Sequence, residues 1–146
     1  TKPYVLSKRP EISGIKEEVR LSIENGKFHI IAVRVYDEAE VQQIYKKIID
    51  AWRNVGGSYK QIGEASKVTI DGQNWYFRVY SNPEGSPIYD YPAADTKVLI
   101  GHNPTYWASL TKISGKDIII IEGPESLGSA QLSRDKLEYI AKQIQL

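Results

Sequence analysis

The stretch VRLSIENGKFHIIAVRVYDEAEVQQIYKKIIDAWRNVGG, residues 19–57, holds two strands, a turn and a helix in immediate succession. From Val19 to Ile23 apolar residues alternate with polar ones, as in a strand. Asn25-Gly26 suits a tight type I′ turn, after which the chain returns as a strand over 28–36. The first half of that return strand is apolar on both faces, which predicts an interior position in a sheet.

The same stretch then predicts a helix that begins after Asp37. Glu40 follows at the spacing of a capping box, in which an acidic or hydroxyl side chain caps the first turn. Gly56-Gly57 ends the helix, because glycine accepts the left-handed conformation there. Apolar residues recur at three- and four-residue steps and form one stripe: Val41, Ile44, Tyr45, Ile48, Trp52 and Val55.

A second hairpin is predicted around Asp71-Gly72. Its return strand alternates two sets of side chains, so we expect one set in the core and the other more exposed. The two sets are Trp75, Phe77 and Val79 on one face and Tyr76, Arg78 and Tyr80 on the other.

Prolines, a glycine and aspartates over 81–96 predict a long loop with a short edge strand inside it. A strand over 98–100, a turn over 102–105 and a partner strand over 106–113 are expected next. The isoleucine run within 117–122 then predicts a strand that is buried on both faces.

After a loop over 123–131, Ser133 is expected to cap the last helix, whose buried stripe is Leu137, Ile140, Ala141 and Ile144. The predicted order is ββ-α-βββββ-α, which favours an α+β fold with an antiparallel sheet of about five to seven strands packed against two helices. Residues 19–146 form one domain, and residues 1–18 form an extended lead-in or tether that joins the fold near Ile12 or Ile15.

Composition narrows the classes of function. Lys plus Arg number 19 against 18 Asp plus Glu, and they are interspersed, which disfavours nucleic acid as a partner. The chain has no cysteine, so it has no disulfide or thiolate site, and no stretch approaches the ~20 apolar residues of a membrane span. It has no methionine and begins Thr1-Lys2-Pro3, which is typical of a trimmed or processed chain. An extracytoplasmic location, secreted or tethered through an upstream segment, is therefore expected; a cytoplasmic one is the alternative.

Candidate catalytic groups are few. His29 is in phase with a buried strand face, and His102 sits in the predicted turn. Two histidines without thiolates do not complete a usual zinc site, and neither a nucleophile elbow nor a phosphate loop is present in the sequence. No metal, cofactor or catalytic residue is therefore assigned. A small hydrolase built on His102 and a nearby carboxylate is the weakest alternative.

Aromatic residues are the one compositional excess, with 10 tyrosines and 3 tryptophans. Tyr and Trp populate binding surfaces because they offer large contact area at low entropic cost, but Tyr also favours strands for structural reasons. We expect an interaction surface for a protein, peptide or glycan formed by Tyr76, Tyr80, Tyr89, Tyr91, His102, Tyr106 and Trp107.

The element order resembles that of PsbP-like domains and of small extracytoplasmic lipoprotein domains of unknown function. The resemblance rests on the hairpin, the helix from Asp37 to Val55, the run of strands and the last helix, LSRDKLEYIA over 132–141. It implies an accessory or binding role outside the cytoplasm, with no site residues to carry over. A non-enzymatic binding domain is thus the function expected, and a structural or assembly subunit of a microbial or viral surface is the alternative.

Overall fold

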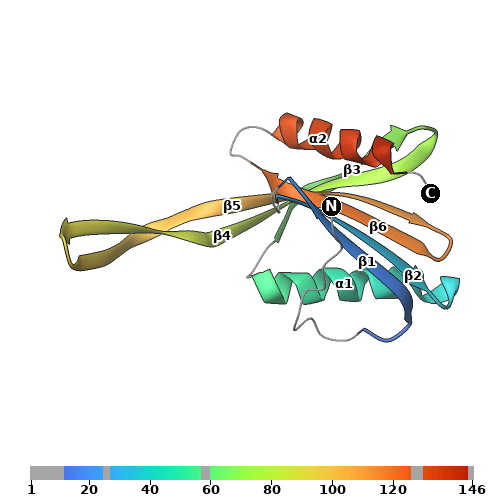
Figure 1. Ribbon diagram of the computed structural model, residues 1–146, viewed down its shortest axis with the longest axis horizontal. Helices are drawn as coiled ribbons and strands as arrows, with labels where there is room; N and C mark the ends of the chain where they lie inside the picture. The colour runs from blue at the N-terminus through green and yellow to red at the C-terminus, as the bar shows by residue number, and fades with distance from the viewer. Residues whose placement is uncertain (1–11, 25–26, 57–59, 126–129, 145–146) are drawn as a thin grey trace.

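The computed structural model describes residues 12–24, 27–56, 60–125 and 130–144. Its 6-stranded sheet has the order β1-β2-β6-β5-β4-β3, and every pair of neighbours is antiparallel. Helices α1 and α2 cover opposite faces of the sheet (Figure 1), which confirms the predicted α+β class. The elements are β1 (Ile15–Ile23), β2 (Phe28–Val35), the short 3-10 helix η1 (Glu38–Glu40), α1 (Val41–Gly56), β3 (Lys60–Ile70), β4 (Gln73–Ala93), β5 (Thr96–Ser114), β6 (Asp117–Glu125) and α2 (Ala130–Gln143).

The isoleucine strand β6 lies between β2 and β5 and is buried on both faces, as predicted. Side chains alternate along a strand, so Ile118 and Ile120 pack under α1 while Ile119 and Ile121 pack under α2. One strand therefore contributes to both cores, and each helix has its own apolar layer to cover.

Local chemistry explains the elements that were predicted correctly. The Asp37 side chain accepts a hydrogen bond from the Ala39 N–H at 3.0 Å and caps η1, which leads directly into α1. Asp71 and Gly72 both have positive φ, as the type I′ turn between β3 and β4 requires. In the first hairpin the Lys27 N–H donates to the Glu24 carbonyl; the predicted turn residues Asn25 and Gly26 lie outside the described part of the chain.

The predictions of a loop over 81–96 and of a turn over 102–105 are wrong. Strand β4 continues to Ala93, and β5 runs without interruption from Thr96 to Ser114, so the strands expected over 98–100 and 106–113 are one. Prolines are tolerated on a strand whose outer edge has no partner, and register shifts between Asn82 and Ser86 absorb the irregular residues.

The last helix begins earlier than predicted. Ser133 lies inside α2, which starts at Ala130, so Ser133 is not its cap. The buried stripe is confirmed, since Leu137, Ile140 and Ala141 are buried and Ile144 packs against them. At the other end of the chain, Ile12 and Ile15 pack against the core under α1, where the lead-in was expected to join the fold.

The close packing of Phe28 on the backbone of Gly123 predicts a large effect for a small substitution. A Cβ at Gly123 would lie 2.3 Å from Cδ1 of the buried Phe28 ring, so Gly123→Ala forces that ring to move. We expect a loss of about 1–3 kcal/mol in the free energy of unfolding, measured by urea denaturation.

Gly101→Ala is the matched control, because a Cβ there meets only Ile88 Cδ1 at 4.0 Å. Its expected effect is neutral to stabilising by up to about 1 kcal/mol, since alanine restricts the unfolded chain. Equal stability of the two variants would contradict the close packing of Phe28 on Gly123.

Candidate functional site

The distal halves of β4 and β5 form a long twisted ribbon that projects from the body of the molecule (Figure 1). We call residues 82–105 the arm. β3 pairs with β4 only as far as Lys60 and Ser81, and β6 pairs with β5 only as far as Glu125 and Tyr106. Beyond these points the described residues of the arm pair only with each other.

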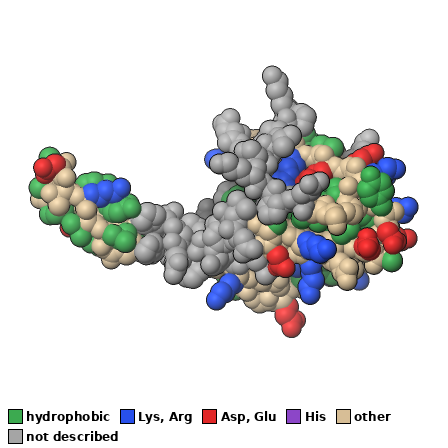
Figure 2. Space-filling view, turned by 90° about the horizontal axis from the view of Figure 1, so that it is seen from below, with side chains coloured by type: hydrophobic (Ala, Val, Ile, Leu, Met, Phe, Trp, Pro, Cys, Tyr) green, Lys and Arg blue, Asp and Glu red, His purple; other side chains and the backbone are tan. Residues whose placement is uncertain are grey.

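The outer part of the arm, residues 88–101, exposes apolar side chains. Figure 2 shows hydrophobic side chains gathered at the far end of the arm, around one cationic side chain. The exposed fractions exceed a third for every large apolar residue except the half-buried Ile88: Tyr91 64%, Ile100 62%, Leu99 51%, Val98 45% and Tyr89 36%. The arm is therefore the most continuous exposed apolar segment in the described part of the chain.

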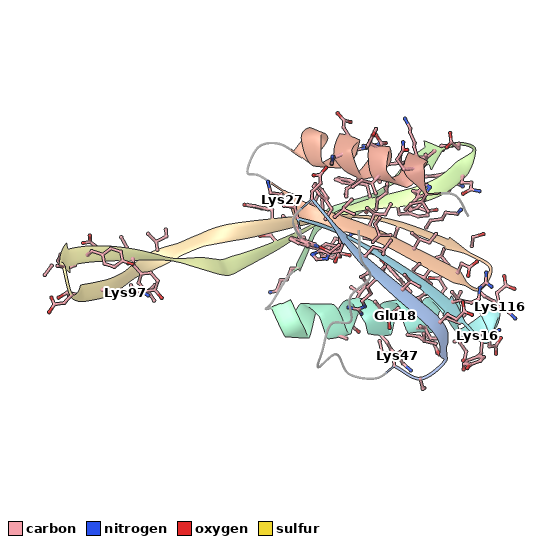
Figure 3. The ribbon with its side chains drawn as sticks, viewed as in Figure 1. Lys16, Glu18, Lys27, Lys47, Lys97 and Lys116 are labelled. Atoms are coloured by element: carbon pink, nitrogen blue, oxygen red, sulfur yellow. The ribbon has the colours of Figure 1, made fainter. Side chains whose placement is uncertain are left out.

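Apolar residues occupy both faces of this ribbon. Tyr89 pairs with Leu99, and the next pair along, Asp90 with Val98, points to the opposite face. On the first of these faces the Lys97 ammonium lies 3.8 Å from the centre of the Tyr89 ring (Figure 3), a cation–π contact. Either face of the ribbon therefore offers apolar area to a partner.

The backbone edges of the arm are poorly suited to pairing with a further strand. β4 carries Pro87 and Pro92, which have no N–H to donate, and a register shift lies between Asp90 and Ala93. On β5, Ile100 is the extra residue where the register shifts between the Ile88 and Tyr89 pairs. Bulges and prolines protect sheet edges in this way, so recognition by the arm must come from its side chains.

The base of the arm is anchored in the sheet on the α1 side. Trp107 pairs with the buried Tyr80, and its ring stacks on His29 with centroids 6.3 Å apart. Trp107 also donates a hydrogen bond to the carboxyl group of Glu122, which pairs with His29 across the two central strands. His29 is thus half-buried in an aromatic contact, close to the core position expected for it.

Glu122 is the most buried ionisable group in this region, with 2% of its side chain exposed. Burial raises the pKa of its carboxyl well above the ordinary 4.5, and the hydrogen bond from Trp107 opposes this rise. The neighbouring hydroxyls of Ser109 and Thr111 are also buried on this face. Among the described residues, neither hydroxyl has a hydrogen-bond partner, and the same holds for Oε2 of Glu122.

The structure divides the predicted site residues into separate groups. Tyr89 lies about 26 Å from Trp107 along the ribbon, at roughly 3.3 Å for each of the intervening strand residues, so no single pocket joins them. Tyr89 and Tyr91 are on the arm, and Tyr106 and Trp107 are half-buried at its base. On the sheet, Tyr76 is exposed and Tyr80 is buried. The side chain of His102 lies outside the described part of the structure.

Sequence reasoning missed the aliphatic residues that complete the exposed surface. Val98, Leu99 and Ile100 form an apolar run that predicts a buried strand. They are exposed because no other described strand or helix packs against this part of the arm. Glu122 was missed as well, although it continues the two-residue alternation of Ile118 and Ile120 and so falls on a buried face.

No protein-family model matches the sequence, and no curated protein matches it either. The resemblance to PsbP-like domains and the extracytoplasmic location therefore stay predictions. Neither α1 nor α2 has the length and apolar character that a bilayer-spanning helix needs.

The buried carboxyl predicts a pH dependence of stability. Above about pH 4.5 the unfolded chain releases the Glu122 proton while the native state keeps it, so native stability falls as pH rises towards the native pKa. Glu122→Gln removes this contribution. In urea denaturation, the free energy of unfolding of the variant should rise relative to that of the wild type as pH rises from about 5 to about 7.5. The expected change is up to about 1.4 kcal/mol per pH unit.

The exposed amide of Gln42 provides the control, because Gln42→Ala removes no ionisable group. Gln42→Ala should keep a nearly constant difference from the wild type across the same pH range. A constant difference for Glu122→Gln too would show that the Glu122 carboxyl ionises normally in the native state.

Proposed function

We propose that this protein is a non-enzymatic binding domain that holds a protein partner with the outer part of its arm. The observation that carries the proposal is the set of five large apolar side chains exposed there, on a ribbon that no other described element covers. Monomeric proteins rarely expose so continuous an apolar segment unless it is a site of interaction.

The energetics of a two-stranded ribbon support a binding role. An isolated hairpin is marginal in water, because two strands bury too little apolar surface to offset the entropy of ordering the chain. Packing a partner against Tyr91, Leu99 and Val98 supplies the missing burial. Tyr89 and Tyr91 add large rigid contact area with a polar tip, which is the character of residues that dominate binding energy.

A protein partner fits the arm better than a lipid bilayer or a nucleic acid. Asp90 and Asp95 lie at the outer end of the ribbon, and both are exposed. Insertion of this end into hydrocarbon would desolvate two carboxylates, and phosphate backbones would repel them. Aliphatic residues such as Val98 and Ile100 suit an apolar protein surface more than the hydroxyl-rich surface of a glycan.

The buried acid at the base of the arm fits a structural role. Glu122 is enclosed beneath Trp107, and a general acid or base must reach its substrate within hydrogen-bond distance. We assign Glu122 to the stability of the arm's base and no chemistry to it.

A capture experiment with matched variants tests the proposal. The immobilised chain with Tyr91→Ser, Val98→Ser and Leu99→Ser should recover its partner from an extract of source cells at least about tenfold less well than the wild type, since interface anchors contribute more than about 1 kcal/mol each. Mass spectrometry of the captured proteins measures the loss.

Tyr36→Ser with Tyr139→Ser removes from the body two tyrosines that are 64% and 60% exposed, and should leave capture unchanged. Circular dichroism and Tm confirm that both variants fold. Equal recovery by the arm variant and the body variant would refute the assignment of binding to the arm.

A further inference from the structure

A second apolar surface lies on the body, on the side of the sheet that α2 covers. α2 packs over β6, β5 and β3, and its apolar contacts include β4 through Trp75 and Phe77. On the same face of β1 and β2, Val19 pairs with Ala32 and Leu21 pairs with Ile30. We call these residues the β1–β2 shelf.

The shelf is apolar and incompletely covered. Val19 is 50% exposed, and Leu21, Ile30 and Ala32 are half-buried. Its face is set by register, because Ala32 pairs with Ile119 and Ile30 pairs with Ile121, both of which pack under α2. The shelf is thus the outer part of a core layer that α2 is too narrow to cover.

Charges at both ends of the shelf lie beside charges of opposite sign, and the exposed Glu17 lies opposite Arg34 in the register. At one end the Arg34 guanidinium bonds Asp117 at 2.8 Å, and at the other end the Lys136 ammonium bonds Glu24. The Arg34 pairing also lowers the pKa of Asp117 through that hydrogen bond. With opposite charges side by side at each end, the shelf favours an apolar occupant over an ionic one.

We propose that the outer arm of one copy of this chain packs on the β1–β2 shelf of a second copy. This inference rests on the proposed function and names the partner as the chain itself. In each copy the described residues leave one arm and one shelf exposed, and both surfaces are apolar. The arm extends away from β1 and β2 of its own copy (Figure 1), so the contact joins different copies.

Two further properties of the chain support this contact. The shelf and the arm are both strand surfaces, and the side chains of strands interdigitate when two sheets stack face to face. The net charge of +1 leaves little long-range repulsion between copies. Because the arm and the shelf are different surfaces, reciprocal exchange between two copies gives a closed dimer, and a one-way contact builds a ring or a filament.

A mixing experiment is decisive, because the arm and the shelf are different surfaces that can be blocked separately. Val19→Glu blocks the shelf and leaves the arm intact, whereas Val98→Glu with Leu99→Glu places a carboxylate on each face of the arm and leaves the shelf intact. We expect the wild type to form larger species as its concentration rises in sedimentation velocity, and each variant alone to stay monomeric.

An equimolar mixture of the two blocked variants should form a 1:1 heterodimer and nothing larger, because one contact survives between an intact arm and an intact shelf. Thr69→Glu, exposed on the α1 side of the opposite edge strand β3, should assemble like the wild type. Val19→Lys should behave as Val19→Glu does, and circular dichroism confirms folding of each variant.

Failure of the mixture to form a heterodimer would overturn the proposal, and so would a wild type that stays monomeric at high concentration. Arm-to-arm pairing would appear as a Val19→Glu variant that still forms dimers. If the wild type is monomeric and the arm substitutions still abolish capture of another protein, the shelf assignment fails and the proposed function remains.

Discussion

Burial of β6 on both faces is the constraint on which the rest of the structure depends. A strand with Ile118 and Ile120 on one side and Ile119 and Ile121 on the other exposes apolar surface to water on whichever face is left open. Both faces of the sheet must therefore be covered, and the chain supplies one amphipathic helix for each. The position of β6 between β2 and β5 places both helices over the centre of the sheet.

In the described part of the chain, two helices are too few to cover both faces of a six-stranded sheet completely. α1 packs on β2 and β6 on one face of the sheet, and α2 packs on the strands from β6 to β3 on the other. The areas of the two faces that neither helix covers differ in chemistry. On the α1 side, β3 and β4 expose Lys67, Thr69 and Tyr76, which are compatible with water; on the α2 side, β1 and β2 present the apolar shelf. Of the two areas, only the apolar shelf would be stabilised by a cover that removes it from water.

The parts of the fold that follow from local chemistry could be predicted from the sequence. A cap such as Asp37, a turn such as Asp71-Gly72 and a stripe such as that of α2 each depend on residues close together in the chain. The arm could not be predicted this way. Pro87 and Pro92 indicate a loop unless they lie on a strand edge that pairs with no other strand, and here that edge exists only because β3 and β6 end before the arm begins. Of the candidate site, Tyr89 and Tyr91 were named from the sequence. Their distance from Trp107 could not be predicted, because it arises from the extended strands that replace the expected loop over 81–96.

The continuity of β4 and β5 from the core to the tip gives the arm its value as a binding element. Trp75 and Phe77 fix β4 in the core under α2, and Trp107 fixes β5 through Glu122, before either strand leaves the body. The direction of the ribbon is therefore set by buried side chains and not by a hinge. A surface held in its binding geometry loses less conformational entropy on association than a loop of the same composition would. The same apolar residues placed on a loop over 81–96 would bind more weakly, since ordering that loop would offset part of the apolar contact.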